Sequence, residues 1–490
     1  MKRLRRLLIS LMITALMAAG MPMTAFAKPD WPSDTGIESE AGIVMDMDSG
    51  AILYGQNIHL TYPPASITKI LTALIVLENC NLDDTVTFST TAVNQVEADS
   101  GNKISVVAGD QLSVEDCLYS MLLVSCNQAA NALAEHTAGS ISAFVDMMNE
   151  KLAELGCQES HFENPSGLNG DNQYVSAYDM ALIAQAAYDN ETLVEISSAT
   201  THKIAPTTQN PDGFTIRGEH RLCVTEDPSS PYYYPEAIAG KTGYLIKAGN
   251  TLVTYAVKDN RRLVSVILKG QPRQYFVDGK ALLEFGFRSF QHYTVADYES
   301  RYVTGNETIN LDKGSFQASD LMIDPDSVIT LPNSASFEDA DITLGALPEI
   351  SPDNAVALLT YSYNDRTIGT AYLLAKDGVT IDGNDSASEA ATTAFDTANA
   401  EAPLATASNA EKPQRPHKDI SVAGVLITIL IVLLVLGVIG LISWFIYSKK
   451  KEAKALAKRR ERRRQRLQRS GDEEEFERLL SEYKNKTRKK

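Results

Sequence analysis

The sequence predicts an α/β fold in which helices flank an antiparallel sheet, followed by a small β-rich domain, a stalk and one transmembrane helix. Two pairs of short strand-like runs enclose a long stretch with helical periodicity. Strands at both ends with helices between them favour one sheet that contains both pairs. With 490 residues, 44% of them hydrophobic, the chain is long enough to bury two or more cores.

Residues 1–27 have the pattern of a secretory signal peptide. Four basic residues precede an apolar run from Leu7 to Ala19, and Ala25-Phe26-Ala27 supplies the small residues that a signal peptidase needs. An uncleaved anchor is the alternative, but the apolar run is short and the cleavage pattern is good. We therefore expect a mature chain that begins at Lys28 and folds outside the cytoplasm.

Residues 36–290 are expected to form the α/β domain. Asp48-Ser49-Gly50 separates one pair of strand-like runs and residues 258–261 separate the other, which is the composition of two tight hairpins. Between the hairpins, Ser113 and Ser176 each stand three residues before an acid at the head of an apolar-periodic run. This pattern predicts a helix N-cap at both serines.

The next segments are expected to be a β-rich domain and a flexible stalk. Residues 293–380 contain short β-branched runs such as Val328–Leu331 and Ala355–Tyr361, broken by Asp, Asn, Gly and Pro. Residues 382–419 are rich in Ala, Thr, Ser and acidic residues and show no sustained apolar period, which is typical of a stalk.

Residues 420–447 contain no charged residue and are long enough to span a bilayer as a helix. The tail that follows, residues 448–490, is rich in Lys and Arg, so the positive-inside rule places it in the cytoplasm. We expect a single-pass protein of the cell membrane with its bulk outside. The basic tail is interpreted first as a stop-transfer flank, with binding to anionic lipid or to a partner as the alternative.

The charge pattern excludes several classes of protein. The formal net charge is −17, and the basic excess lies at the two ends, so the strongly acidic body is not expected to bind nucleic acid. No histidine stands in a recognisable zinc pattern, and we expect no metal and no cofactor. Gly240-Lys241-Thr242 imitates the end of a phosphate-binding loop, but Pro235 occupies the position of its first glycine.

Ser66 and Lys69 are the strongest candidates for catalysis. They are predicted to share one face in the first turn of an apolar helix that runs through residues 67–77. A serine hydroxyl becomes a good nucleophile when a base removes its proton, and a lysine can be that base if burial and a second cation depress its pKa. The spacing recurs twice in the basic tail, so it carries weight only with partners.

Two further motifs supply these partners. Ser125-Cys126-Asn127 lies between two helical runs, and Lys241-Thr242-Gly243 precedes the last pair of strands. The first spacing recurs at Ser100-Gly101-Asn102 and Ser362-Tyr363-Asn364, whereas Lys-Thr-Gly has no second copy. Asn127 and Ser125 also suit helix caps, which is the plainer alternative.

In this order, the three motifs resemble those of the penicillin-binding proteins and the serine β-lactamases. More closely, the chain is similar to the low-molecular-mass D-alanyl-D-alanine carboxypeptidases, which are serine peptidases. The resemblance covers roughly residues 36–380 and includes Asn164-Pro165-Ser166-Gly167-Leu168, itself the composition of a turn, and the run 176–181. It implies a β-lactamase/transpeptidase-like fold for the α/β domain.

The resemblance also implies the roles of the site residues. Ser66 would attack the penultimate D-alanine of a peptidoglycan stem peptide to form an acyl-enzyme, and β-lactams would acylate it as inhibitors. Lys69 would be its base, and Asn127 would hold the peptide amide and orient Lys69. The other implied roles are proton transfer to the departing D-alanine by Ser125 and Lys241, carboxylate binding by Thr242 with Lys241, substrate contact by Gly243, and an oxyanion hole formed by the N–H groups of Ser66 and Tyr244.

Some features depart from the family or remain open. Tyr244-Leu245 follows the Lys-Thr-Gly motif where many relatives have a threonine in second place, and Arg273 is either a further cation for the carboxylate or a surface residue. All five cysteines lie in the α/β domain, and Cys126 is interpreted as a buried apolar residue rather than a reactive thiol.

Two alternative functions are weighed against the carboxypeptidase. A β-lactamase would need an acidic deacylation motif, and none is recognisable. A wall-sensing receptor would report occupancy of the fold through the membrane helix, but it would not need all five side chains Ser66, Lys69, Ser125, Asn127 and Lys241.

Overall fold

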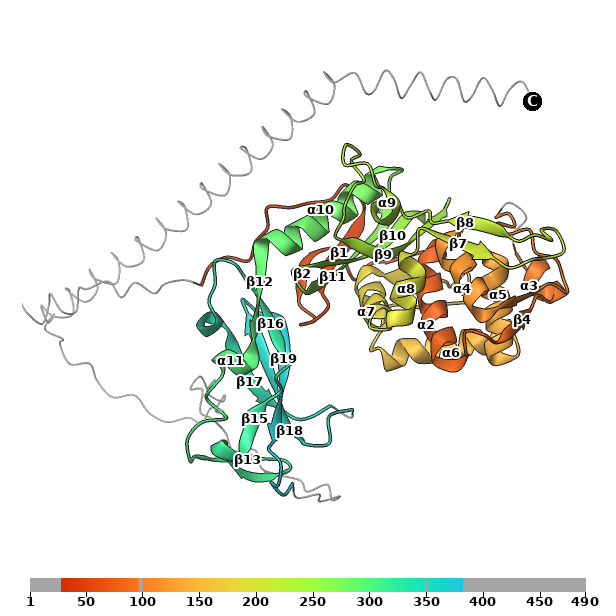
Figure 1. Ribbon diagram of the computed structural model, residues 1–490. Coiled ribbons are helices and arrows are strands. Elements are labelled where there is room, and N and C mark those ends of the chain that lie inside the picture. The colour runs from red at the N-terminus through yellow and green to blue at the C-terminus, as the bar shows by residue number, and fades with distance from the viewer. Residues whose placement is uncertain (1–27, 97–99, 349, 382–490) are drawn as a thin grey trace, which may run out of the picture. The chain divides into compact units, whose positions relative to one another are not determined.

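A five-stranded antiparallel sheet is the frame of the computed structural model, which describes residues 28–96, 100–348 and 350–381 (Figure 1). The strand order is β2-β1-β11-β10-β9. β1 pairs with β11 and thereby joins the two hairpins, so the predicted single sheet is confirmed. The strands are β1 (Ala41–Asp46), β2 (Ile52–Gln56), β9 (Ala237–Leu245), β10 (Gly249–Lys258) and β11 (Arg261–Gly270).

Helices cover both faces of this sheet (Figure 1). α10 (Gln274–Ser289) packs on one face, and α7 and α8 contact the other. The helices between β2 and β9 are η1 (Ala65–Thr68), α2 (Lys69–Asn79), α3 (Thr90–Asn94), α4 (Val114–Leu123), α5 (Asn127–Ala138), α6 (Ile141–Glu154), α7 (Ala177–Tyr188), α8 (Glu191–Ser198) and α9 (Arg221–Val224). Three short ribbons lie among them: β3 (Thr61–Tyr62) with β6 (Val175–Ser176), β4 (Thr85–Thr87) with β5 (Gln111–Ser113), and β7 (Thr201–Ile204) with β8 (Phe214–Arg217).

Both predicted N-caps are confirmed. Ser113 accepts a hydrogen bond from the Asp116 amide at the start of α4, and Ser176 accepts one from the Asp179 amide at the start of α7. The two acids use their carboxylates elsewhere, Asp116 toward His202 and Asp179 toward Ser160. Each helix therefore begins where a serine satisfies an amide that has no partner within the helix.

A β-rich region follows α10 and has its own buried cluster of apolar side chains. The predicted runs at 328–331 and 355–361 lie in strands β16 and β18. The elements are β12 (Phe290–Thr294), α11 (Val295–Tyr298), β13 (Thr308–Leu311), β14 (Gly314–Gln317), η2 (Ala318–Asp320), β15 (Leu321–Ile323), β16 (Val328–Pro332), η3 (Phe337–Asp339), β17 (Asp341–Gly345), β18 (Ala355–Tyr363) and β19 (Arg366–Ala375). That this region is a separate domain from residue 293 stays a prediction.

The predicted terminal segments lie outside the described residues. These are the signal peptide (1–27), the stalk (382–419), the transmembrane helix (420–447) and the basic tail (448–490). Within the part of the chain that the structure describes, no helix has both the length and the apolar character needed to cross a membrane.

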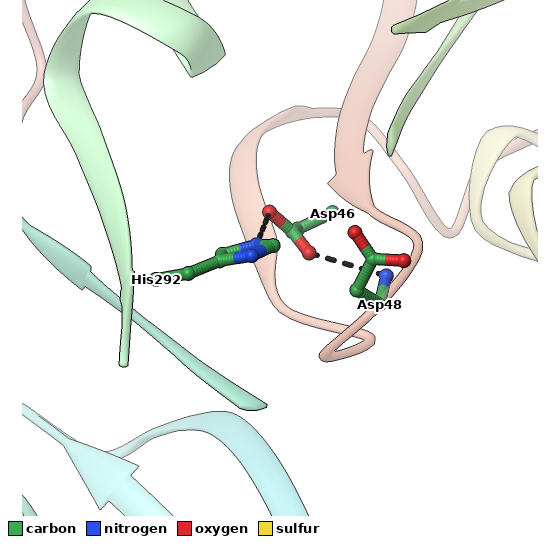
Figure 2. A group of neighbouring side chains, drawn as sticks. All are labelled: Asp46, Asp48 and His292. Carbon is green, nitrogen blue, oxygen red and sulfur yellow. Dashed lines mark hydrogen bonds and ion pairs between the residues drawn. The ribbon is translucent and has the colours of Figure 1, made fainter. Parts of the chain in front are cut away.

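The β-rich region is tied to the end of the sheet by the buried carboxylate of Asp46, the last residue of β1 (Figure 2). His292 of β12 donates to this carboxylate at 2.7 Å, and Arg261 of β11 lies 3.3 Å from it. Arg261 also donates to the carbonyl of Phe290, at 2.7 Å. The buried anion of β1 therefore binds one group from strand β11 and one from the β-rich region.

Asp46, Asp48 and His292 lie close enough together for a cation, but their partners suit an ion-pair network instead (Figure 2). Arg261 neutralises Asp46, and Arg262 binds Asp48 at 2.6 Å. A divalent cation here would face two guanidinium groups, so we assign no metal to this cluster.

The Asp46 network makes a testable contribution to stability. Burial works to raise the pKa of Asp46, but the hydrogen bond and charge of His292, together with Arg261, outweigh it and hold the pKa below the ordinary 3.8. Because the folded-state pKa is depressed, this contribution is complete above the unfolded-state pKa and is lost as the pH falls through the folded-state pKa. We expect Asp46→Asn to cost about 2 kcal/mol at pH 7 and to weaken the acid dependence, measured by urea denaturation.

Asp48→Asn is the matched control for this measurement. Asp48 is more exposed than Asp46, and its partner Arg262 keeps a second carboxylate in Asp189. Equal losses of stability in the two variants would contradict a special role for the buried Asp46 carboxylate.

Candidate active site

Ser66 lies in a tight turn that the surrounding chain holds in place. It belongs to the 3₁₀ turn η1, and α2 begins only at Lys69, so the predicted α-helix starts two residues later than Ile67. Ala65 has a φ of 52°, which is unusual for a residue with a side chain. The Thr68 hydroxyl binds the Ala65 carbonyl at 2.9 Å, and the Thr251 hydroxyl of β10 binds the Pro64 carbonyl at 2.9 Å.

Lys69 is fully buried, and its amine nitrogen touches three oxygen atoms. Nζ lies 2.9 Å from Ser66 Oγ and 2.8 Å from Asn127 Oδ1, and it also bonds the Ser166 carbonyl. Burial first, and then the charge of Lys241, holds the pKa of Lys69 well below its usual range. A neutral amine fits this setting, because its two hydrogens can meet the two carbonyl-type oxygens while its lone pair accepts the Ser66 proton.

The turn at 164–168 supplies the third oxygen. Asn164 Oδ1 accepts hydrogen bonds from the amides of Gly167 and Leu168, at 2.8 Å and 3.1 Å, which closes the turn as its composition predicts. Gly167 has a φ of 80°, and a Cβ there would overlap the carbonyl oxygen of Ala65. The turn therefore presses against η1 and aims the Ser166 carbonyl at Lys69.

Ser125 and Asn127 do not act as caps. Cys126 occupies the N-cap position of α5, and its side chain makes no capping bond. Asn127 is the first residue of α5 and uses its side-chain oxygen for Lys69. Ser125, with a φ of 62°, faces the same cleft as Ser66. Among the described residues, its hydroxyl makes no hydrogen bond to Lys69 or Lys241.

Cys126 is a buried apolar residue, as the sequence indicated. It has no exposed surface, and burial raises the pKa of its thiol to about 11. All five cysteines of the chain are free.

Lys241 and Gly243 bring strand β9 to the nucleophile. Lys241 is 1% exposed, and burial lowers its pKa to about 8, with Glu219 working in the opposite direction. Its Nζ donates to the Thr242 carbonyl at 2.8 Å. A Cβ on Gly243 would lie 2.8 Å from the Ser66 amide nitrogen, so only glycine allows β9 this close to Ser66.

A cleft of about 720 Å³ opens above these groups. Six of the eight predicted site residues line it, while Lys69 and Lys241 are buried and do not reach its surface. Tyr244 lines the cleft and is 62% exposed. Arg273 is not among the described residues that line the cleft. The six predicted site residues that line the cleft are Ser66, Ser125, Asn127, Thr242, Gly243 and Tyr244.

Sequence reasoning missed several groups of the site. The Ser166 carbonyl is backbone, and no residue type marks it. Lys103, Glu219, Arg221 and Tyr275 also line the cleft, and Lys103 forms an ion pair with Glu219 at 3.2 Å. They stand outside the three motifs, and only their position in the folded chain identifies them.

The chain is similar to known D-alanyl-D-alanine carboxypeptidases. The profile of the family described as D-alanyl-D-alanine carboxypeptidase matches residues 27–271. DacB2 of Mycobacterium tuberculosis is 35% identical over 265 residues, which is 53% of this chain and 84% of that protein. DacF of Bacillus subtilis is 29% identical over 296 residues, 59% of this chain and 72% of that protein.

One solved structure is similar to part of the chain. The crystal structure of the D-alanyl-D-alanine carboxypeptidase from Mycobacterium tuberculosis shares 32% sequence identity with this chain and covers 55% of it and 95% of its own chain, with a TM-score of 0.46.

The close approach at Gly243 can be tested with one methyl group. We expect Gly243→Ala to push β9 away from Ser66 and to slow labelling of Ser66 by a fluorophosphonate about a hundredfold, because small displacements of catalytic groups cost about that much. Gly345→Ala is the control, since a Cβ there meets only the Leu358 carbonyl, at 3.7 Å. Labelling of Gly243→Ala at the wild-type rate would show that the approach is not needed.

Proposed function

We propose that this chain, which belongs to the D-alanyl-D-alanine carboxypeptidase family, removes the terminal D-alanine from peptidoglycan stem peptides with Ser66 as nucleophile and Lys69 as general base. The serine-type carboxypeptidase activity follows from the family. The observation that carries the assignment of residues is the position of Lys69 Nζ between Ser66 Oγ, Asn127 Oδ1 and the Ser166 carbonyl.

The acylation step begins with proton transfer. Neutral Lys69 takes the hydroxyl proton of Ser66, and Ser66 Oγ forms a bond to the carbonyl carbon of the penultimate D-alanine. Collapse of the tetrahedral intermediate breaks the C–N bond to the terminal D-alanine, whose nitrogen takes up a proton as it leaves. Water then attacks the ester and releases the shortened peptide.

Ser125 and Lys241 are assigned to the leaving group. Ser125 lines the same cleft as Ser66, and Lys241 is buried in strand β9 next to Thr242, which also lines the cleft. In this proposal the terminal carboxylate is bound by the Thr242 hydroxyl and the Lys241 ammonium, and Ser125 passes a proton toward the departing amine. Lys241 must be protonated for this role, and the pKa of about 8 keeps it largely so at neutral pH.

The oxyanion is assigned to the backbone N–H groups of Ser66 and Tyr244. The support is the short distance between the Gly243 position and the Ser66 amide, which brings the start of η1 and the end of β9 to one point. Removal of one such donor typically costs about 10²- to 10³-fold in rate.

The charges of the cleft favour a peptidase over a β-lactamase. Among the described residues that line the cleft, Glu219 is the one carboxylate, and it is paired with Lys103. A β-lactamase needs a group that activates water for fast deacylation, and a paired glutamate on the rim does not suit that task.

Penicillin tests the nucleophile and the base together. We expect penicillin to acylate Ser66, and Lys69→Met to slow acylation at least about a thousandfold while keeping the buried volume filled. Mass spectrometry locates the adduct, and D-alanine release from a D-alanyl-D-alanine peptide measures turnover. An adduct that persists in Ser66→Ala would refute the nucleophile, and a large loss of stability in Lys69→Met would identify a structural lysine.

We propose, from the sequence patterns alone, that the protein is anchored in the cell membrane by residues 420–447, with the catalytic residues outside and the basic tail inside. Protease added to intact cells should then degrade the region 36–290 and spare an epitope at Lys490. Loss of that epitope with the region 36–290 intact would reverse the topology.

A further inference from the structure

His220 is a buried histidine that the mechanism above does not use. It is 7% exposed and immediately precedes α9. Its ring Nε2 lies 3.1 Å from the Val253 carbonyl and 3.2 Å from the Thr254 hydroxyl, both on β10. In the sheet, Val253 stands opposite Lys241 and Thr254 opposite Gly240. The ring therefore binds the sheet at the register that carries Lys241.

The contact with β9 itself is equally close. A Cβ on Gly240 would lie 2.6 Å from His220 Nε2, so the ring packs directly on the backbone of the residue before Lys241. The ring of Phe276, from α10, stands edge-on to it with the centroids 5.8 Å apart. His220 is thus fixed from three elements, β9, β10 and α10.

Cys223 completes the environment of the ring. Its sulfur lies 3.2 Å from His220 Nδ1. Burial raises the pKa of the Cys223 thiol above its ordinary value and lowers the pKa of His220 to about 4. Both groups are therefore neutral, the thiol donates to Nδ1, and Nε2–H donates to the Val253 carbonyl. This pair is not the thiolate and imidazolium of a cysteine protease.

The residues on either side of His220 in the chain face the cleft, whereas His220 is buried. Glu219 and Arg221 both line the cleft, while the side chain between them is buried. Glu219 forms an ion pair with Lys103, and the Arg221 guanidinium lies over the ring of Tyr232, 5.1 Å from its centroid. The buried His220 thus lies in the chain between two charged residues that line the cleft.

We propose that His220 is a positioning residue that holds Glu219 at the cleft, where its charge acts on Lys241, and so sets the pH range of the carboxypeptidase. The proposal rests on the assignment of protonated Lys241 to the leaving group. His220 stands outside the three motifs and acts on Lys241 through a neighbouring charge.

The direction of the effect follows from the charges around Lys241. Glu219 raises the pKa of Lys241, whereas burial and Lys103 lower it, and the positive charge of Lys241 acts in turn on Lys69 and His220. If Glu219 moves away, the pKa of Lys241 falls. Because the protonated form is required, activity is then lost at a lower pH, and the alkaline limb of the pH profile shifts downward.

Two amides at position 220 separate positioning from simple packing. Glutamine can place an N–H near the position of the ring Nε2 and keep the bond to Val253, whereas asparagine is too short to do so. We expect His220→Gln to retain kcat/KM within about threefold, and His220→Asn to lose about tenfold. The alkaline limb should shift downward by about half a pH unit in the asparagine variant alone.

A double-mutant cycle with Glu219→Gln tests the route of the effect. Glu219→Gln alone should shift the alkaline limb of the pH profile to lower pH. Adding His220→Asn to this variant should shift the limb no further. Additive shifts, or a limb that stays in place in His220→Asn and in His220→Gln, would overturn the proposal. If the asparagine variant does not fold, Glu219→Gln alone decides, because an alkaline limb that stays in place in that variant would show that Glu219 does not act on Lys241.

Penicillin acylation of Ser66 distinguishes a failure of the proposed function from a failure of the role of His220. If the wild-type protein is not acylated at Ser66, the proposed function fails. If it is acylated and turns over, but the limb does not respond as described, only the role of His220 fails.

Discussion

The active site depends on a lysine side chain that has no contact with solvent. An ammonium group in such a place costs several kcal/mol unless oxygen atoms and a counter-charge surround it. Lys69 has three oxygen atoms around its nitrogen but no carboxylate among its hydrogen-bond partners, and a second buried cation, Lys241, acts on it. Both conditions favour the neutral amine, which is the form that can remove the proton of Ser66.

Three segments far apart in sequence must meet within hydrogen-bond distance to build this environment. Two glycines remove the side chains that would prevent it, since a Cβ at Gly167 would overlap η1 and one at Gly243 would crowd the Ser66 amide. Ala65 and Ser125 also help to bring the segments together, because their left-handed backbone turns the chain sharply at the cleft. Strain of this kind is retained where the surrounding structure fixes it and the chemistry needs it.

Much of this arrangement could be predicted from the sequence. The hairpins and the N-caps at Ser113 and Ser176 depend on local composition, so pattern reasoning found them. The motif residues were proposed because Ser66 and Lys69 suit a nucleophile and its base, and because the three motifs together resemble those of a known family. The Ser166 carbonyl could not be found in that way, because every residue has a carbonyl and only the fold aims this one at Lys69. The start of α2 was misplaced because a 3₁₀ turn and an α-helix share the same residue preferences over one turn.

Residues that act over long sequence distances were also beyond prediction. Asp46 and His292 are separated by 246 positions, and nothing in either segment signals the other. His220 resembles any buried histidine until the register of β9 and β10 places it beside Lys241. In both cases the informative quantity is a distance in the folded chain.

The ionisation of Lys69, which acts as a neutral base in this mechanism, can be measured directly. NMR of the protein with isotope-labelled lysine side chains, assigned with Lys69→Met, follows each amine through a pH titration. We expect Lys69 to lose its proton at a pH well below that of the surface lysines, and Lys241→Met to raise the pKa of Lys69 by removing the nearby positive charge. A Lys69 signal that titrates together with the surface lysines and does not respond to Lys241→Met would contradict this expectation.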